Sequence, residues 1–316
     1  MTGVAKEPAH NSAPEGGDLT PPSIDELTAF FVDFVGMFIA AGGQTARVAR
    51  CAQRIGLVFG VRVEMLLLSR HAVITVASRC DGATYRTVVT PFKHIGINFD
   101  TAFLLNRLSW EFFDDWLDAP AVPDPGKGGP KPDTASLTGF CAPEEARAQS
   151  GAPGTRRELA RLKERFYGVI QRPRLSEWVL CLMIGAASAS FCRLFGGDWA
   201  AMGIVFFASQ AAFLVRRFMV VRHHMDIRLG FLAASFTASF LSAVGSWHVP
   251  TATPEIAVAS GILFLVPGVP LLNAVNDILS GHTLMGISRG AAAAVLTLCI
   301  AFGLAVTLMV TGFNVL

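Results

Sequence analysis

Hydrophobic and polar residues are distributed so that a first part of the chain has short amphipathic elements and a second part has long apolar segments. The first part opens with Ser23 and Glu26, which form an S-x-x-E capping box, and apolar residues then recur at helical spacing over 24–38. The apolar stretch 29–41 is too short to cross a bilayer, which takes roughly 20 residues, and Asp33 lies within it. This pattern predicts a buried amphipathic helix.

The next elements predict a small α+β domain over residues 23–118. Gly42 and Gly43 end the first helix, and a second helix is expected from Thr45 to Phe59. Three strand-like runs follow, starting at Val61, His71 and Tyr85, with Cys80, Asp81 and Gly82 as the turn between the last two, and a helix is expected over 98–118. A domain of this size is large enough to have its own core.

Three segments flank this domain. Residues 1–22 lack the apolar stretch and cleavage site of a signal peptide, which predicts a disordered cytosolic tail. Residues 119–155 are rich in Pro, Gly, Lys and Asp, which predicts a linker. Residues 156–175 form a basic amphipathic segment directly before a hydrophobic block, and we expect it to lie along the cytoplasmic lipid headgroups.

Five long apolar segments occupy residues 176–316 and predict about five transmembrane helices. Their approximate ranges are 178–195, 199–221, 227–247, 256–272 and 287–312, of which the fourth is short and broken. Arg and Lys precede the first segment and surround the second connection, whereas the third connection has neither. The positive-inside rule therefore places the first domain in the cytoplasm and the C-terminus in the periplasm, with Arg193 as the exception.

Small residues at four-residue spacing indicate close helix packing in this membrane part. The pairs are Gly185 with Ala189 and Ala186 with Ser190, and a third series runs through residues 234, 238 and 242. We expect them to have a structural role.

Charge and composition agree with a soluble part followed by a membrane part. Charged residues make up 39 of the first 175 positions and 11 of the last 141, and mean hydropathy over the whole chain is +0.48. A formal net charge of +2 without basic runs disfavours a nucleic-acid partner. The six cysteines are scattered, and His223 and His224 have no Cys or Glu at ligand spacing, so neither a metal nor a cofactor is predicted. Motifs of hydrolytic enzymes are missing as well, so we do not expect an enzyme.

One interruption falls within the fourth apolar segment. Pro267, Gly268 and Pro270 stand where a transmembrane helix should continue. Such breaks are tolerated where the freed backbone groups line a cavity or are buried in protein.

Polar residues follow this break directly. Asn273, Asn276 and Asp277 are spaced i, i+3 and i+4, so they should share one helix face. Transporters hold small polar solutes beside half-helix ends of this kind, which makes the cluster a candidate transport site. The alternative is that the span ends here and Asp277 lies in interfacial water.

Three stretches together resemble the bacterial threonine/serine exporter family, and in particular its split, YjjP-like form. They are SEWVLCLMIGAASASFCRLFGGDWAA, FFAS and FLVPGVPLLNAVNDILSGH. The resemblance covers residues 24–118 and 172–313. It implies a cytoplasmic domain before about five spans, with the remaining helices supplied by a second, shorter YjjB-like membrane subunit or, in fused members, by the same chain. It also implies efflux of threonine and serine or, for the split form, of succinate.

The resemblance also implies which positions matter for transport. These are Pro267, Gly268, Pro270, Asn273, Asp277, Gly281 and His282, with Gly196, Gly197 and Asp198 as a conformational turn.

Together these observations predict an α-helical polytopic inner-membrane protein with an N-terminal cytosolic α+β domain. The predicted function is a subunit of an exporter for small carboxylate-bearing metabolites that works by alternating access with a partner subunit or as a homo-oligomer. Asn273 and Asn276 would bind the solute, Asp277 would carry a proton or contact an ammonium, and His282 or Arg289 would attract a carboxylate. The alternative function is a membrane-anchored sensor or scaffold whose cytosolic domain binds a ligand.

Overall fold

The computed structural model describes residues 20–68, 71–79, 84–91, 98–117, 154–172 and 175–312. They belong to two compact units, Met1–Arg172 and Pro173–Leu316, and each unit is treated by itself. The predicted turn at Cys80, the predicted linker as far as residue 153 and the first 19 residues of the predicted tail lie outside the described residues.

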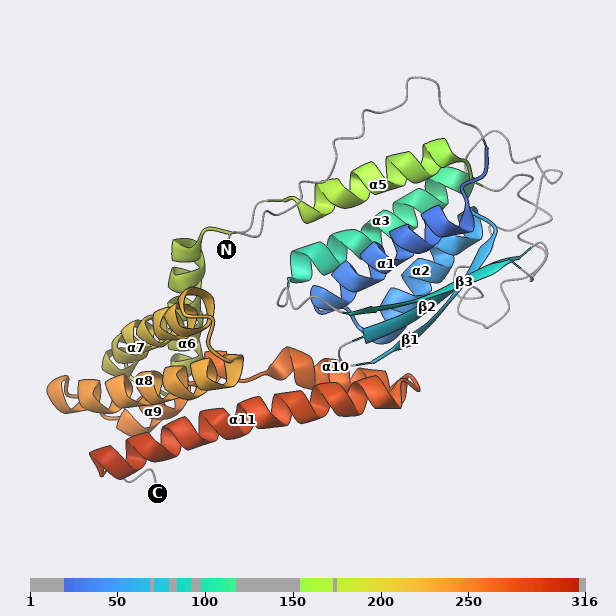
Figure 1. Cartoon of the computed structure of the whole chain (residues 1–316). Helices are drawn as coiled ribbons and strands as arrows, with labels where there is room; N and C mark the ends of the chain where they lie inside the picture. Colours follow the sequence, from blue (N-terminus) through green and yellow to red (C-terminus); the bar gives the residue numbers. More distant parts are fainter. Residues whose placement is uncertain are drawn as a thin grey trace, which may run out of the picture. The chain divides into compact units, whose positions relative to one another are not determined.

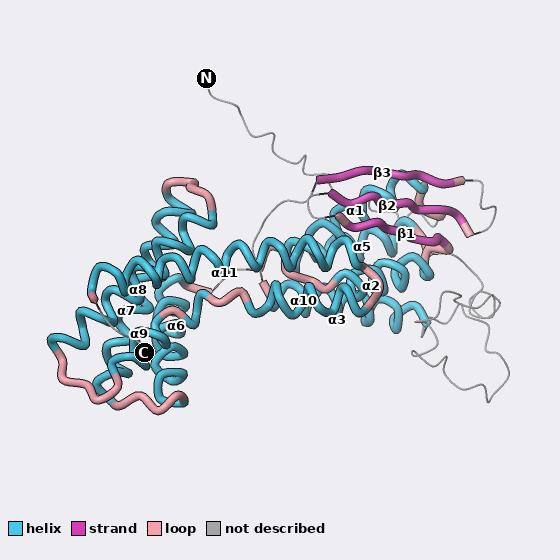
Figure 2. Tube along the Cα trace, turned by 90° about the horizontal axis from the view of Figure 1, so that it is seen from below, coloured by secondary structure: helices cyan, strands magenta, loops and turns pink. Residues whose placement is uncertain are grey.

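Unit 1 is a three-stranded sheet covered on one face by helices (Figure 1). Its elements are α1 (Ile24–Ala40), α2 (Thr45–Val58), β1 (Val61–Leu67), β2 (His71–Ser78), β3 (Tyr85–Pro91), α3 (Phe99–Leu117) and α5 (Arg156–Ile170). The strands lie in the antiparallel order β1-β2-β3, as the tube view shows (Figure 2). Each of these elements up to α3 begins within one residue of its predicted position.

Local sequence accounts for these boundaries. The capping box is present, because the Ser23 N–H donates to Glu26 Oε2 at 2.9 Å and the Glu26 N–H donates to Ser23 Oγ at 3.2 Å. Alternate β2 residues, Ala72, Ile74 and Val76, are buried, and α1 packs against this strand. The core of the unit combines aliphatic side chains with phenylalanine rings, and its largest fully buried side chains are Phe31, Phe34, Phe38 and Phe166.

Helix α5 belongs to unit 1. Its apolar residues Leu159, Leu162 and Phe166 are at most 3% exposed. The Phe166 ring lies 5.7 Å from the Phe30 ring and 5.9 Å from the Phe34 ring. The helix is amphipathic as expected, but the face expected to lie on lipid headgroups is packed against protein. A hydrophobic stripe identifies a buried face without saying whether lipid or protein covers it.

Unit 2 is a helical bundle. Its elements are α6 (Glu177–Leu194), α7 (Trp199–Arg217), a π-helical turn η2 (Phe218–Arg222), α8 (Ile227–His248), α9 (Pro254–Gly261), a 3₁₀ turn η3 (Leu263–Leu265), α10 (Gly268–Leu279) and α11 (Thr283–Thr311). Among the described residues, four helices are long and apolar enough to span a membrane. A fifth span exists if α9 and α10, which meet at a 56° bend, count as one.

The break falls where the sequence predicted it. Helix α9 and η3 end before Pro267, whose backbone adopts φ −78° and ψ 56°, and α10 starts at Gly268. The second predicted span of this unit ends in a π-helical turn, because η2 continues α7 as far as Arg222. Long spans and one interrupted span therefore match the hydropathy pattern.

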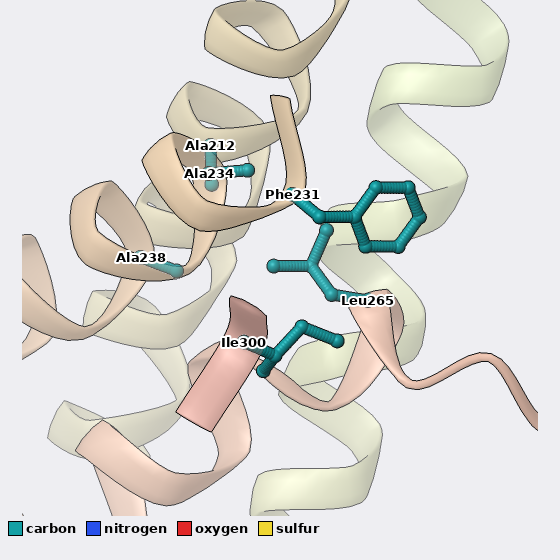
Figure 3. Close-up of a cluster of buried hydrophobic side chains, with 6 residues drawn as sticks. All are labelled: Ala212, Phe231, Ala234, Ala238, Leu265 and Ile300. Atoms are coloured by element: carbon teal, nitrogen blue, oxygen red, sulfur yellow. The ribbon is translucent and has the colours of Figure 1, made fainter. Parts of the chain in front are cut away.

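Small residues form the interior of unit 2. Figure 3 shows the buried cluster of Ala212 from α7, three residues of α8, Leu265 of η3 and Ile300 of α11. In the predicted series on α8, Ala234, Ala238 and Ser242 are all fully buried. On α6, Gly185 and Ala189 are buried, whereas Ala186 and Ser190 are exposed. The helices of unit 2 therefore pack by close approach of their backbones and not by contacts between large side chains.

Candidate functional site

The candidate site lies in a hairpin formed by α10 and the start of α11. The two helices are joined by a tight turn in which Gly281 adopts φ +82°. The Gly281 N–H donates to Ile278 O at 3.0 Å and the His282 N–H donates to Asp277 O at 2.8 Å, which is the Schellman pattern of a helix end. This backbone conformation explains the glycine in the predicted motif, because other residues rarely adopt it.

Within the hairpin, Asp277 and Arg289 form a buried ion pair. Arg289 Nη1 donates to Asp277 Oδ2 at 2.7 Å, and the two side chains are 15% and 1% exposed. Asp277 comes from α10 and Arg289 from the second turn of α11. Both charges lie in a unit with few others, and each neutralises the other where removal from water is costly.

Close packing holds the two helices at this distance. A Cβ atom added at Gly286 would lie 2.7 Å from the Ala274 carbonyl and 2.5 Å from Ile278 Cγ1. One turn further, a Cβ added at Gly290 would lie 3.7 Å from the Ala274 Cβ, an ordinary van der Waals contact. Gly286 therefore allows α10 to come near enough for the pair to form.

The three polar residues after the break do not share one environment. Asn273 is 8% exposed and Asp277 is 1% exposed, so both lie on the packed side of α10. Asn276 is exposed. The i and i+4 positions stay aligned along a helix, but i+3 is offset to one side, and here that offset separates Asn276 from the other two.

His282 follows the turn and has a buried ring nitrogen. Its Nδ1 atom is buried and has no hydrogen-bond partner among the described residues, while the residue as a whole is half-buried. The interrupting residues Pro267, Gly268 and Pro270 lie at the other end of α10, where Pro267 is buried and Gly268 is exposed. The predicted site residues of this segment are thus distributed along the length of one hairpin.

The turn Gly196–Asp198 is a separate feature at an end of the bundle. Gly196 adopts φ +92°, and Asp198 caps α7 by accepting the Ala201 N–H at 2.7 Å. Asp198 also accepts the Thr251 hydroxyl and the Ala252 N–H, each at 2.8 Å. These hydrogen bonds, above all the one from the Ala201 backbone, lower the pKa of the Asp198 carboxyl. Through the hydrogen bonds of Asp198, the turn before α7 is joined to the loop before α9.

Sequence reasoning named Asp277 and Arg289 but did not pair them. They are 12 residues apart, and the pairing depends on the turn at Gly281 that folds α11 back along α10. A signal existed, because opposite charges on either side of a glycine turn in an apolar segment favour contact. Among the described residues, His, Cys, Asp and Glu form no group of three that could hold a metal ion.

Comparison with known proteins identifies the family. The family model described as "Putative threonine/serine exporter" (ThrE) matches residues 154–311. Two relatives, each named "Probable succinate transporter subunit YjjP", are similar over 153 residues, which is 48% of this chain. The protein from Escherichia coli K12 is 38% identical and that from Klebsiella aerogenes is 36% identical.

These matches span 59% and 58% of the two relatives' own lengths. No solved structure matches. The apolar helices of unit 2 agree with the family assignment, which identifies a multi-pass membrane protein of a transporter family. On these grounds the chain belongs to the threonine/serine exporter family.

Proposed function

We propose that this chain is one subunit of an inner-membrane exporter for small carboxylate-bearing metabolites, and that the Asp277–Arg289 pair is its solute-binding element. The observation that carries the proposal is the pair itself: two charges, 2.7 Å apart, buried between the helices that follow a broken span. A purely structural hairpin of apolar residues would be as stable or more so without them, since buried ion pairs seldom add net stability.

Arg289 is the group that recognises the carboxylate. A guanidinium has five donors in a planar fork, so it can bind a second carboxylate beside Asp277, and its side chain is 15% exposed. The start of α10, after the break, offers a solute carboxylate fewer hydrogen-bond donors than Arg289 does. At the start of α10 the Gly268 N–H already donates to Val266 O, the Leu271 N–H donates to Pro267 O, and Pro270 has no N–H.

Exchange between partners gives the pair its role in transport. A solute carboxylate that takes Arg289 leaves Asp277 to accept a proton or to bind the ammonium of an amino acid. In either case net charge in the hairpin is conserved, so the conformational change of alternating access moves no unpaired charge through lipid. One acid and one base match a zwitterionic amino acid, while a dicarboxylate would need a further cation, for which His282 is nearest in the chain.

The outer face of the hairpin supports a partner subunit. Leu272, Val275 and Leu279 are 66%, 55% and 80% exposed, and Asn276 is exposed among them. Lipid could cover the apolar residues but offers no hydrogen bonds to a side-chain amide. We assign this face to the second, shorter membrane subunit, in agreement with the word "subunit" in the names of both relatives.

We also place unit 1 on the cytoplasmic side. Arg216 and Arg217 end α7 and Arg222 ends η2, shortly before the start of α8, and Arg217 pairs with Glu177 at the start of α6. The loop from Val249 to Thr253 at the opposite end has no basic residue. Cysteines introduced at His224 and Thr251 should react with an impermeant thiol reagent from inside and from outside respectively; the reverse pattern would contradict the orientation.

The test of the site is solute efflux from cells loaded with threonine or with succinate, with and without the second subunit. Asp277→Asn and Arg289→Gln should each slow efflux about tenfold or more, because each removes one charge of the buried ion pair. Asp226→Asn, which also neutralises a carboxylate of unit 2 but at an exposed helix cap, is the matched control and should export normally.

Two further outcomes separate site from fold. The amount of each variant in the membrane is measured alongside, and the exchanged pair Asp277→Arg with Arg289→Asp should insert at wild-type levels. If Asp277→Asn is inserted and exports at the wild-type rate, the pair is not the solute site. If wild type exports neither solute faster than cells without the chain, the substrate class is wrong.

A further inference from the structure

Arg216, in the last turn of α7, is a half-buried cation held between aromatic rings. Its guanidinium carbon lies 5.7 Å from the centre of the Phe213 ring and 5.2 Å from the centre of the Phe231 ring. Both rings are buried, and an added Cβ at Gly230 of α8 would lie 3.5 Å from Arg216 Cγ. The side chain therefore packs against α7 and α8 together. The rings attract the cation but do not neutralise its charge.

The other half-buried arginines of unit 2 differ from Arg216, because each has a carboxylate partner. Arg217 pairs with Glu177, and Arg289 pairs with Asp277. Arg216 has neither a hydrogen bond nor an ion pair within the part of the chain that the structure describes. Partial removal of a cation from water is costly without a counter-ion, so an anion from outside the chain would stabilise this position.

The surface that follows Arg216 carries an excess of positive charge. Arg222 at the end of η2 and Arg228 at the start of α8 are exposed. The two carboxylates of this region are already engaged, because Glu177 pairs with Arg217 and Asp226 caps α8 by accepting the Arg228 N–H at 2.8 Å. An anion that approaches Arg216 therefore meets further cations.

The same surface is also apolar, which decides the kind of anion. Large apolar side chains alternate with the cations and are 40–59% exposed; they are Phe218, Val221, Met225, Ile227 and Leu229. A small soluble anion makes no favourable contact with these side chains. A phospholipid presents a phosphate and an acyl chain side by side, so it matches the cations and the apolar residues at once.

We propose that the segment 216–230 binds an anionic phospholipid, whose phosphate pairs with Arg216 and whose acyl chain lies along the exposed apolar side chains. A planar guanidinium can donate two parallel hydrogen bonds to phosphate oxygens, which suits a single well-defined headgroup position. Arg222 and Arg228 add electrostatic attraction for lipids of net negative charge. The site is separate from the Asp277–Arg289 pair, and it does not rest on the proposed function.

Lipid binding is tested on the purified full-length chain in an uncharged detergent. Phosphatidylglycerol, which is anionic, is compared with phosphatidylcholine of the same acyl chains, which has no net charge. Native mass spectrometry measures the lipid retained, and the thermal midpoint measures stabilisation. Near saturation, phosphatidylglycerol should raise the midpoint by about 3 °C and phosphatidylcholine by less. Glycerol 3-phosphate, which has the phosphate without acyl chains, should leave the midpoint unchanged.

Variants locate the bound lipid. Arg216→Gln should lower the affinity for phosphatidylglycerol about fivefold and leave that for phosphatidylcholine unchanged, whereas Arg216→Lys keeps the charge and should keep most of the preference. The matched control is Arg193→Gln. The Arg193 guanidinium also lies beside a ring, 5.2 Å from that of Trp199, but it donates to the Gly197 carbonyl at 3.1 Å. This control should prefer phosphatidylglycerol as wild type does.

A photoreactive phosphatidylglycerol gives a second readout on wild type, which is needed if Arg216→Gln does not fold. A diazirine in its acyl chain should label peptides from segment 216–230. Equal binding of the two lipids by wild type would overturn the proposal. An equal rise with glycerol 3-phosphate would assign the site to a soluble anion. Labelling confined to other peptides, or a full preference in folded Arg216→Gln, would mean that Arg216 does not hold the lipid.

Discussion

The two units of this chain bury different kinds of side chain. The largest fully buried residues of unit 1 are aromatic rings, Phe31, Phe34 and Phe38 of α1 and Phe166 of α5. The fully buried residues of unit 2 include Ala212, three alanines of α8 (Ala234, Ala238 and Ala243) and a set of hydroxyls. Large exposed apolar side chains, by contrast, are concentrated on unit 2, where Trp178, Leu298 and Met309 are 73%, 69% and 85% exposed.

The solvent of each unit explains this difference. In water, burial of a large apolar side chain stabilises a fold because the alternative is exposure to water. In a bilayer an apolar side chain that faces lipid is about as stable as one that is buried in protein. Helices therefore associate through backbone contact and hydrogen bonds. In unit 2 Ser235 Oγ donates to Ile300 O at 2.7 Å and the Ser239 and Thr307 hydroxyls lie 2.7 Å apart, linking α8 to α11.

Because buried rings stabilise unit 1, we expect the largest loss of stability from a large-to-small substitution there. Phe34→Ala removes a fully buried ring that contacts Phe30, Phe38 and Phe166, and we expect a loss of about 3–5 kcal/mol in the free energy of unfolding of unit 1. Amide hydrogen exchange of the full chain, resolved by segment, should show faster exchange throughout unit 1.

A matched aromatic substitution sharpens this prediction. Phe103 on α3 is 62% exposed, so Phe103→Ala should change the exchange of unit 1 by less than about 0.5 kcal/mol. Equal effects of the two substitutions would mean that the Phe34 ring is not the core residue that the packing indicates.

The opposite substitution should be the damaging one in unit 2. A Cβ added at Gly303 on α11 would lie 2.6 Å from the Leu232 carbonyl oxygen and 2.9 Å from the Phe236 nitrogen, both backbone atoms of α8. Because backbone cannot move aside as a side chain can, Gly303→Ala should destabilise the contact of α8 with α11 by about 1–3 kcal/mol. Hydrogen exchange of these two helices in lipid nanodiscs measures the effect.

Gly203 on α7 is the control for this contact. Nothing lies within 4 Å of a Cβ added there, so Gly203→Ala should be neutral or stabilising by up to about 1 kcal/mol through helix propensity. If Gly303→Ala were also neutral, close backbone approach would not be what holds unit 2 together.

Local signals made most elements of the fold predictable. The capping box before α1, the alternation along β2 and the length of each apolar segment are properties of neighbouring residues. What covers an amphipathic face is a long-range property. The apolar face of α5 was assigned to lipid, and it is buried against Phe30 and Phe34, about 130 positions earlier in the chain.

The residues of the candidate site could be predicted from the sequence, but the way they lie relative to one another could not. The break at Pro267 and the carboxylate of Asp277 stand out in an apolar segment, so they could be named from the sequence. The pairing of Asp277 with Arg289 depends on the backbone of Gly281 and on close packing at Gly286.

The smallest predicted effect concerns the capped turn of unit 2 at Asp198. Hydrogen bonds from the Ala201 and Ala252 N–H groups and from the Thr251 hydroxyl hold the pKa of its carboxyl below the ordinary value of 3.8. The folded chain therefore binds this proton less readily than the unfolded chain does, so the contribution to stability is present at neutral pH and is lost as pH falls through the folded pKa.

Asp198→Asn keeps an oxygen that can cap α7 but cannot titrate, and asparagine is as good a cap as aspartate. At neutral pH the thermal midpoint should fall slightly, since the charge that strengthens three hydrogen bonds is lost. As pH falls below 3.8 and through the lower pKa of the folded state, the difference between wild type and variant should shrink and then disappear, because the wild-type carboxyl becomes protonated in the folded chain as well. A difference that stayed constant from neutral pH to acid would mean that Asp198 acts through its shape alone, and the loop before α7 would then be joined to the loop before α9 without help from charge.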